Sequence, residues 1–215
     1  MQVTYNPAVF NVSTISQAMS IILTPEESTT EERWRLETPY VCDLIAKSVD
    51  IAPNSFVLDY GCGIGRIAKE LIARHGCRVI GVDISPSMRA LSVIYVESDR
   101  FAACAPEMLV AMTERGFRFD AAVSIWVLQH CLHPGDDVAR LRSALGPSGG
   151  LFVLNDKIRR IPTVEAGWVD DSIDVRALLM QNFDLRQEGP LERDKTTENL
   201  VQSSFWAAFS MQGAA

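Results

Sequence analysis

The chain has 215 residues, 47% of them hydrophobic, and a formal net charge of −7 at pH 7. This length allows one sizeable core, so we expect a single domain over residues 1–215 with an added helical cap. The acidic balance argues against nucleic-acid binding. The sequence has neither an apolar run long enough to predict a membrane-spanning helix nor the pattern of a secretory signal. Five cysteines without C-x-x-C spacing predict reduced thiols and a cytoplasmic protein.

Residues 1–53 are predicted to form a helical lid. Residues 1–12 lack periodicity, and an amphipathic pattern then predicts a helix over residues 13–23. Further helix starts are predicted, in order, at Thr24-Pro25-Glu26-Glu27, at Ser28-x-x-Glu31 and at Thr38-Pro39, the last helix ending near Ser48. Trp34 and Tyr40 are predicted either to anchor the core or to line a substrate pocket.

Residues 54–156 alternate between short apolar runs and helical patterns, which is typical of a parallel sheet covered on both faces. Strands are predicted at 56–59, 78–83, 100–104, 121–125 and 151–155. Helices are predicted at 64–75, 87–96, 109–115 and 136–145, and a turn at 147–150. Ligands of such sheets bind beyond the carboxyl ends of the strands.

Residues 157–215 are predicted to supply the acceptor side of the molecule. The pattern predicts a long loop over 157–171, a helix over 172–182 and a closing antiparallel pair at 183–191 and 203–211. Trp168 lies in the predicted loop, and we expect it to line a substrate pocket.

The most informative stretch is Asp59-Tyr60-Gly61-Cys62-Gly63-Ile64-Gly65, which joins the first predicted strand to a helix. Glycines there let a ligand approach the backbone, and the helix start offers N–H donors to a carboxylate or phosphate. The dinucleotide fingerprint G-x-G-x-x-G needs a glycine where Arg66 stands, and no P-loop sequence is present. Asp83 ends the second predicted strand, where a carboxylate can accept both hydroxyls of a bound ribose.

Four ordered segments together resemble the class I S-adenosylmethionine (SAM)-dependent methyltransferases, in particular their broad small-molecule group. They are residues 57–65, 79–88, 119–130 and 145–151. The resemblance implies a Rossmann-like α/β fold with a seven-stranded, mainly parallel sheet, an antiparallel C-terminal strand and an N-terminal helical lid. It also implies SAM as the cofactor, S-adenosylhomocysteine (SAH) as its product, and an O or N atom of a small molecule as the methyl acceptor.

Carried over by position, the resemblance implies cofactor contacts from the Gly turn, the end of the second strand and the loops after the third and fourth strands. These residues are Asp59, Gly61, Cys62, Gly63, Gly65, Asp83, Ile84, Met88, Glu107, Met108, Ser124, Ile125 and Trp126. Asp83 would hold the ribose, and Ile84 and Met88 would flank the adenine. The acidic residue that the family often carries after the third strand is missing, and Glu107 is the nearest substitute.

A methyl group on a sulfonium is already activated, so a general base is needed only if the acceptor must first lose a proton. His130 after the fourth strand and Asp156 after the fifth are the candidates. The alternatives are a packing role for His130 and a solvated loop position for Asp156.

The sequence also bears on metal binding, on nucleic-acid substrates and on functions other than methyl transfer. His130-x-x-His133 has no partner cluster at zinc spacing, so no metal site is predicted. Residues 124–130 lack the Asp/Asn-Pro-Pro-Tyr of DNA amino-methylating enzymes, so DNA is not an expected partner. The sequence leaves open the acceptor, the oligomeric state and a protein or RNA substrate. The remaining alternatives are a non-catalytic SAM-binding or partner subunit of a methyltransferase and a nicotinamide-dependent oxidoreductase.

Overall fold

The structure is a computed structural model that describes residues 3–25 and 27–213. Seven strands form one sheet in the order β3-β2-β1-β4-β5-β9-β8. They are β1 (Phe56–Tyr60), β2 (Arg78–Val82), β3 (Phe101–Cys104), β4 (Phe119–Ile125), β5 (Leu145–Asp156), β8 (Phe183–Gly189) and β9 (Ser204–Met211). Strands β1 to β5 pair in parallel, and β9 runs antiparallel to both of its neighbours. The predicted Rossmann-like fold is therefore confirmed.

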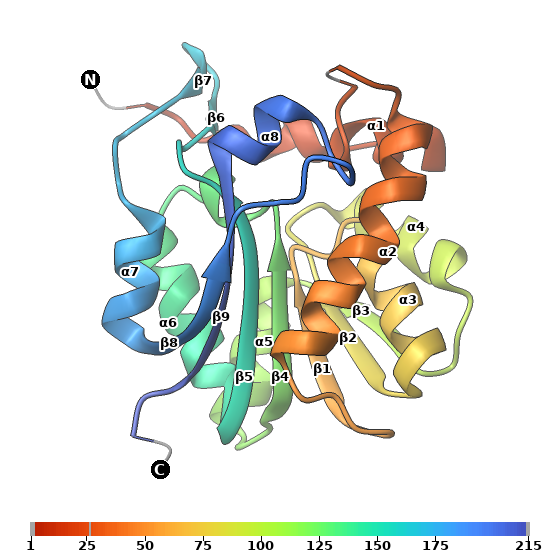
Figure 1. The fold of residues 1–215 in the computed structure, drawn as a ribbon, viewed down its shortest axis with the longest axis vertical. Helices are drawn as coiled ribbons and strands as arrows, with labels where there is room; N and C mark the ends of the chain where they lie inside the picture. Colours follow the sequence, from red (N-terminus) through yellow and green to blue (C-terminus); the bar gives the residue numbers. More distant parts are fainter. Residues whose placement is uncertain (1–2, 26, 214–215) are drawn as a thin grey trace.

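Helices cover both faces of the sheet (Figure 1). One face carries α2 (Thr30–Ser48), α3 (Arg66–His75) and α4 (Pro86–Val96), and the other carries α5 (Pro106–Glu114), α6 (Pro134–Ala144) and α7 (Val175–Asn182). Successive strand residues serve opposite cores, because strand side chains alternate between faces. Val57 packs in the cluster that contains α2 and α3, and Leu58 packs in the cluster that contains α6 and α7.

The carboxyl edge of the parallel strands is covered by short elements from distant parts of the chain (Figure 1). They are η1 (Pro7–Phe10), α1 (Ile15–Ile22), the hairpin of β6 (Ile161–Thr163) and β7 (Gly167–Val169), and α8 (Glu198–Ser203). The prediction of one long loop over 157–171 is wrong, because this segment contains β6 and β7. The hairpin gains a third pairing partner, since Tyr5 bridges Thr163 and the Asn6 N–H donates to the Pro162 carbonyl. Because Tyr5 and Thr163 are far apart in the sequence, their pairing leaves no local pattern from which it could be predicted.

The predicted breaks in the lid helices are also wrong, because α2 is continuous from Thr30 to Ser48 with Pro39 inside it. Its N-cap is Thr29, whose hydroxyl accepts from the Glu32 N–H at 3.1 Å. Pro39 is exposed, so its ring and the hydrogen bond that it removes face solvent. Of the predicted features, Glu26 in the first helix start and Met1 and Gln2 in the irregular segment lie outside the described residues.

Two smaller differences lie in the second half of the sheet. The turn predicted at 147–150 falls inside β5, where the pairing with β4 shifts register between Phe119 and Ala121 and absorbs the extra residues. The polar connection before the last strand contains α8. No helix within residues 3–25 and 27–213 is long and apolar enough to cross a membrane.

Candidate active site

A cavity of about 410 Å³ lies beyond the carboxyl ends of β1, β2 and β4. Its floor is the Gly turn between β1 and α3 together with the end of β2. Its other walls come from the loop after β4, the start of α5, the first turns of α6, and η1 and α1 above. The cavity therefore occupies the place where parallel α/β sheets bind ligands.

The Gly turn is tight in both backbone and space. Gly61, Gly63 and Gly65 have φ values of +76°, +53° and +81°, in the region that favours glycine. A Cβ on Gly63 would lie 2.6 Å from Ile22 Cδ1 of α1, and one on Gly61 would overlap the Val127 side chain. The positive φ values favour glycine at all three positions, and a side chain on Gly61 or Gly63 would also force Val127 or Ile22 to move.

Asp83 closes the floor of the cavity and ties β2 to the Gly turn. Its Oδ2 accepts from the Gly63 N–H at 2.8 Å, and its Oδ1 accepts from the Ser85 N–H at 2.9 Å. Burial raises the pKa of Asp83, and those two N–H groups and Arg89 oppose the rise. Each oxygen spends one lone pair on the backbone, so each can still accept a hydroxyl from a ligand in the cavity.

Asp59 lies deeper, at the end of β1, and is only 3% exposed. Its Oδ2 has no hydrogen-bond partner among the described residues. Burial raises the pKa of Asp59 to about 7, and the positive charge of Arg66 opposes that rise. A buried carboxylate oxygen without a partner is costly, so the site offers a strong acceptor to a donor in the cavity.

Trp126, directly after β4, has a strained backbone. Its φ of +61° is uncommon for a residue with a bulky side chain. The residue lines the cavity, and its indole Nε1 is buried with no acceptor among the described residues. Strain of this kind gathers at ligand sites, which marks the end of β4 as part of the functional wall.

His130 faces the cavity from the loop after β4. Its Nδ1 lies 2.7 Å from the Arg160 carbonyl oxygen. Since a carbonyl only accepts, Nδ1 carries the proton, and Nε2 is an acceptor that lies 3.4 Å from the amide nitrogen of Gln129. Burial lowers the pKa of His130, so the ring is neutral near pH 7. The imidazole packs against Phe10 and Trp168, with ring centroids 5.8 and 5.3 Å away.

Not every residue predicted for the site reaches the cavity. Those that line it are Asp59, Gly61, Cys62, Gly63, Asp83, Ile84, Met88, Glu107, Ile125, Trp126 and His130. Those outside its lining are Gly65, Met108, Ser124, Asp156, Trp34, Tyr40 and Trp168.

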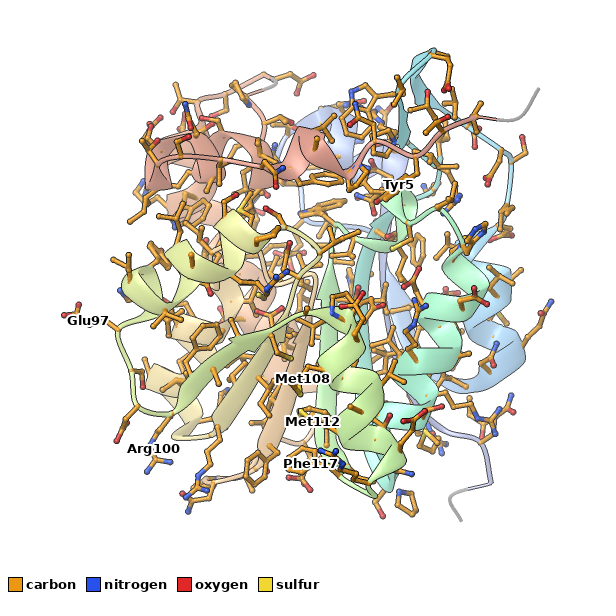
Figure 2. The ribbon with its side chains drawn as sticks, turned by 180° about the vertical axis from the view of Figure 1, so that it is seen from behind. Tyr5, Glu97, Arg100, Met108, Met112 and Phe117 are labelled. Carbon is orange, nitrogen blue, oxygen red and sulfur yellow. The ribbon has the colours of Figure 1, made fainter. Side chains whose placement is uncertain are left out.

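Their positions explain why. Gly65 is the N-cap of α3, Ser124 is buried within β4, and Met108 is 52% exposed on α5, where Figure 2 shows it well away from Tyr5. Asp156 forms an ion pair with Arg160 at 3.7 Å. The Trp34 indole donates to the Tyr95 hydroxyl at 3.2 Å.

Two of the predicted pocket residues have structural contacts instead. The Tyr40 hydroxyl lies in the core and accepts from the Glu192 N–H at 2.9 Å. Trp168 lies outside the cavity lining and contacts two cavity residues, Phe10 in an edge arrangement and His130 in a tilted one.

The structure also adds residues that the sequence did not reveal. Tyr5 and Phe10 enter from the segment predicted to be irregular, and Figure 2 places Tyr5 beside the covering hairpin. On the opposite wall, Asp137 accepts from the Tyr60 hydroxyl at 2.5 Å and from Arg140 at 2.7 Å. Arg66 also lines the cavity, and its place at the first turn of α3 was the available signal. No group of three metal-ligating side chains occurs within the described residues.

Known proteins share this architecture. A family model described as "Methyltransferase domain" matches residues 33–189. A ubiquinone biosynthesis O-methyltransferase of Cereibacter sphaeroides (strain KD131 / KCTC 12085) is 31% identical over 143 residues. That alignment covers 60% of this chain and 57% of the relative, so the chain spans little more than half of the relative's length.

Solved structures show the same fold at low sequence identity. Phosphoethanolamine N-methyltransferase 2 of Haemonchus contortus, in complex with SAM, is 15% identical with a TM-score of 0.61, and the match covers 90% of this chain and 56% of that one. The [4+2]-cyclase SpnF is 16% identical with a TM-score of 0.59, and the match covers 79% of each chain. The fold therefore does not by itself fix the reaction.

Proposed function

The chain belongs to the class I SAM-dependent methyltransferases, and from that premise we propose that it transfers the methyl group of SAM to an oxygen or nitrogen atom of a small-molecule acceptor. The observation that carries this proposal is the cavity floor. Asp83 and the Gly turn are joined by the Gly63 hydrogen bond, and both face the same space. When bound, SAM supplies an electrophilic methyl group on a sulfonium.

The polar groups of the cavity fit the parts of SAM. Asp83 keeps free lone pairs for two ribose hydroxyls, and Ile84 and Met88 offer apolar surface to the adenine. Glu107, at the start of α5, is the acidic group nearest the end of β3 and suits an exocyclic amine. The unpartnered Oδ2 of Asp59 suits the α-ammonium group of the methionine part. The Asp59 assignment would give a hydrogen-bond donor to a buried acceptor that the described part of the protein does not satisfy.

His130 is proposed as the general base. Its Nδ1–H is held by the Arg160 carbonyl, which fixes the ring and directs Nε2 away from that contact. The lowered pKa keeps Nε2 unprotonated near neutral pH, as removal of a proton from a hydroxyl or an ammonium requires. Asp156 does not line the cavity, and its side chain is paired with Arg160, so we assign it no proton transfer.

The N-terminal segment that contains η1 and α1 is proposed to exclude water from the cavity during methyl transfer. Phe10 packs against His130, and the Val12 N–H donates to Ser87 Oγ at 2.9 Å above the start of α4. A dry pocket that aligns the acceptor with the methyl group supplies much of the rate by proximity. An oxygen acceptor is the first to test, since the curated relative is named an O-methyltransferase.

The test is a calorimetric titration of the purified chain with SAM, SAH and NADH, followed by a screen of phenol, alcohol and amine acceptors. We expect micromolar binding of SAM and SAH, no binding of NADH, and methyl transfer to at least one acceptor class. Binding of NADH alone would overturn the cofactor assignment. Binding of SAM without turnover on any acceptor, including protein and RNA, would instead support a binding or partner subunit.

A further inference from the structure

The loop that carries His130 is held by the segment of chain that follows β5. This loop contains the short helix η2 (Leu128–His130). The Gln129 N–H donates to Asn155 Oδ1 at 3.1 Å, and the Gln129 carbonyl accepts from the Arg160 N–H at 2.9 Å. The Arg160 carbonyl in turn accepts from the imidazole of His130. The orientation of His130 therefore depends on the chain that comes after β5.

Arg159 anchors that segment in the interior of the protein. It is only 2% exposed. Its Nη1 donates to the Leu128 carbonyl at 2.9 Å, and its Nη2 donates to the Leu132 carbonyl at 3.5 Å. These two carbonyls stand on either side of His130 in the chain, so one guanidinium holds both ends of the turn. Arg159 lies outside the cavity lining, so its effect on a ligand must pass through this loop.

The charge of Arg159 is balanced by Asp171, which follows β7. The Asp171 Oδ1 accepts from Arg159 Nε at 2.8 Å, and its Oδ2 accepts from Nη2 at 3.0 Å, which makes a two-pronged contact. The Arg159 guanidinium lowers the pKa of Asp171, so this carboxyl group is ionised near neutral pH. A planar guanidinium that is bonded to a carboxylate and to two carbonyls has little freedom to move.

We infer that Arg159 is a positioning residue for methyl transfer, which holds the turn of His130 at both ends and fixes the neighbouring Arg160 carbonyl against the imidazole. This inference rests on the proposed role of His130 as the general base. A displacement of about 1 Å in a reacting group can lower a rate by up to about 100-fold, so the placement of the base matters. Asp171 supports the same function by holding the guanidinium.

Arg159 and Asp171 also affect the charge around the imidazole. Burial is the largest cause of the lowered pKa of His130, and the positive charges of Arg160 and Arg159 lower it further. Asp156 is paired with the Arg160 side chain, and η1 and β7, which pack against the ring, carry no titratable side chain. Loss of the Arg159 charge should therefore raise the pKa of His130, and loss of the Asp171 charge should lower it.

The experiment observes His130 directly in the free protein. Labelling of the histidines with ¹⁵N and ¹³C lets NMR report which ring nitrogen carries the proton, and a pH titration gives the midpoint of protonation. His130→Asn assigns the signals. The variants are Arg159→Met, Arg159→Lys and Asp171→Asn, and their kcat is measured with an acceptor that the wild type methylates.

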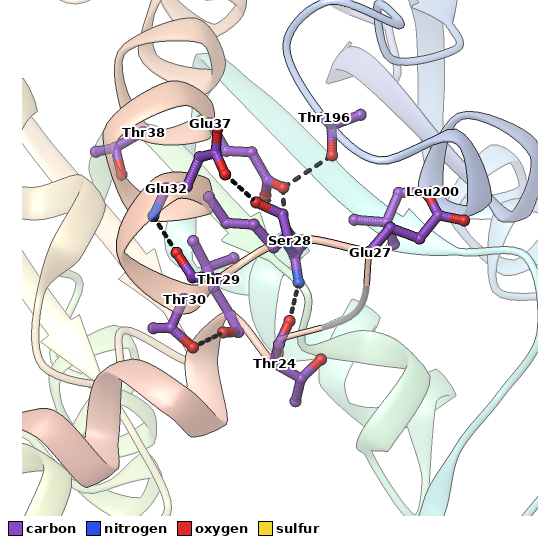
Figure 3. Close-up of polar contacts among 12 residues, drawn as sticks. Thr24, Glu27, Ser28, Thr29, Thr30, Glu32, Glu37, Thr38, Thr196 and Leu200 are labelled. Atoms are coloured by element: carbon purple, nitrogen blue, oxygen red, sulfur yellow. Dashed lines mark hydrogen bonds and ion pairs between the residues drawn. The ribbon is translucent and has the colours of Figure 1, made fainter.

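The matched control is Arg33→Met in the lid. Arg33 is also buried, forms a two-pronged pair with Glu37 at 2.7 and 3.1 Å, and donates to the Thr24 carbonyl at 2.6 Å. Figure 3 shows Glu37 facing Thr196, between the start of α2 and the connection that precedes α8, and neither member of the pair lines the cavity. The control should lower Tm, as loss of a buried pair does, and leave the NMR signals of His130 unchanged.

We expect the wild-type ring to carry its proton on Nδ1 and to titrate with a midpoint below about 6.5. Arg159→Met should mix the two tautomers, move the midpoint to higher pH and lower kcat about tenfold. Arg159→Lys keeps the charge but cannot hold two carbonyls and a carboxylate in one plane, so it should lower kcat with little change in the midpoint. Asp171→Asn should move the midpoint to lower pH.

A purely structural role for Arg159 and Asp171 gives different results. A loosened loop would expose the ring to water, so the midpoint would rise toward about 6.5 in Arg159→Met and Asp171→Asn alike. That result, or a wild-type tautomer in both Arg159 variants, would overturn this inference. If Arg159→Met does not fold, Asp171→Asn decides by the direction of its shift, since the Asp171 side chain is 33% exposed and its change to Asn is milder.

The outcomes also separate this inference from the proposed function. A wild type that neither binds SAH nor methylates any acceptor would overturn the proposed function. His130→Asn with wild-type kcat would remove the general base and this inference with it. Wild-type kcat in the Arg159 variants, beside a strong loss in His130→Asn, would overturn this inference alone.

Discussion

The floor and the mouth of the cavity are built in different ways. The floor uses neighbouring strand ends joined by backbone hydrogen bonds, such as those from the Gly61 and Cys62 N–H groups to the Val82 carbonyl at 2.7 and 3.0 Å. The mouth joins the N-terminal segment, the loop after β4 and the β6–β7 hairpin. These segments meet through a bridge at Tyr5, through a few backbone hydrogen bonds such as that from the Asn6 N–H to the Pro162 carbonyl at 2.9 Å, and through ring contacts.

This difference separates two kinds of chemistry. A backbone-built floor fixes the groups proposed to bind the cofactor, and it tolerates little change. A mouth made of side chains from distant segments can be altered residue by residue, which suits an acceptor that differs between enzymes. Variants in the floor should therefore change cofactor affinity, and variants in the mouth should change turnover or the KM for the acceptor.

The largest effect is expected from His130→Asn. The new amide can still donate to the Arg160 carbonyl, but it removes the basic Nε2. We expect kcat to fall about 100-fold, as is typical for loss of a general base, with SAH affinity unchanged. Steady-state kinetics and calorimetry measure the two quantities. His75→Gln, on α3 away from the cavity, is the control, and unchanged kcat in His130→Asn would make His130 a packing residue.

The pH dependence tests the same assignment. His130 has a folded pKa below the ordinary value of about 6.5, and only its neutral form accepts a proton. At saturating SAM, the kcat/KM of the wild type for the acceptor should therefore fall at pH values below about 6.5, and the profile of His130→Asn should lose that acidic limb. The same lowered pKa means that the unfolded chain binds this proton more readily, so His130 makes the fold less stable as pH falls through that window.

Asp83→Asn should have the next largest effect, confined to the floor. The variant loses a charged acceptor for the ribose, which should weaken SAH binding about 10- to 100-fold. Calorimetry measures the affinity, and Asp184→Asn, an exposed carboxylate on β8, is the matched control. A folded Asp83→Asn that binds SAH like the wild type would remove Asp83 from the ribose site.

Asp59 gives a smaller, pH-dependent effect. Its pKa of about 7 means that the free protein holds this proton at mildly acidic pH, whereas the ligand's ammonium group favours the ionised form. SAH affinity should therefore fall by up to about tenfold as pH drops from about 7 to about 6. Asp59→Asn should bind SAH more weakly and without this pH dependence. A wild-type affinity that does not change over the range would contradict the contact with Asp59.

The apparent stability of the free protein should move in the opposite direction. Because the native state binds the Asp59 proton more tightly than the unfolded chain does, this group stabilises the fold at low pH. That stabilisation is lost as pH rises from the unfolded value of about 3.9 toward about 7. Asp59→Asn should remove this component from the pH dependence of Tm.

The same contrast explains what the sequence predicted. Local residue types predicted three features that the structure confirms: the strand–turn–helix succession around Gly61–Gly65, the helix cap at Gly76 and the helix start at Ser85-Pro86. The floor residues Asp59 and Asp83 were identified for the same reason. Each of these two residues can be recognised from the few residues around it at the end of a strand.

The mouth could not be predicted in this way. Tyr5 reaches it through pairing with Thr163, and Phe10 through a ring contact with His130, and neither contact has a local signature. Trp34 and Tyr40 were predicted either to anchor the core or to line the pocket, and tertiary packing places them in or beside the core. Arg66 was noticed only as a departure from the dinucleotide fingerprint. Its contacts with Thr38 and Trp34 come from another helix and leave no local pattern in the sequence.

The smallest effect is expected from Trp168→Ala at the rim of the mouth. Trp168 is 54% exposed and its ring packs against Phe10 and His130, so its loss should loosen the acceptor wall without touching the floor. Aromatic pairs of this kind contribute about 0.5–1.5 kcal/mol, so the KM for the acceptor should rise about threefold while SAH affinity stays constant.

Val164→Ala is the matched control for Trp168→Ala, since Val164 is 63% exposed in the same hairpin. If Trp168→Ala weakens SAH as much as it raises the acceptor KM, the two halves of the cavity are coupled through His130. The mouth would then belong to the cofactor site as well. If only the acceptor KM changes, the hairpin is the part of the molecule in which acceptor specificity can be altered independently of the cofactor.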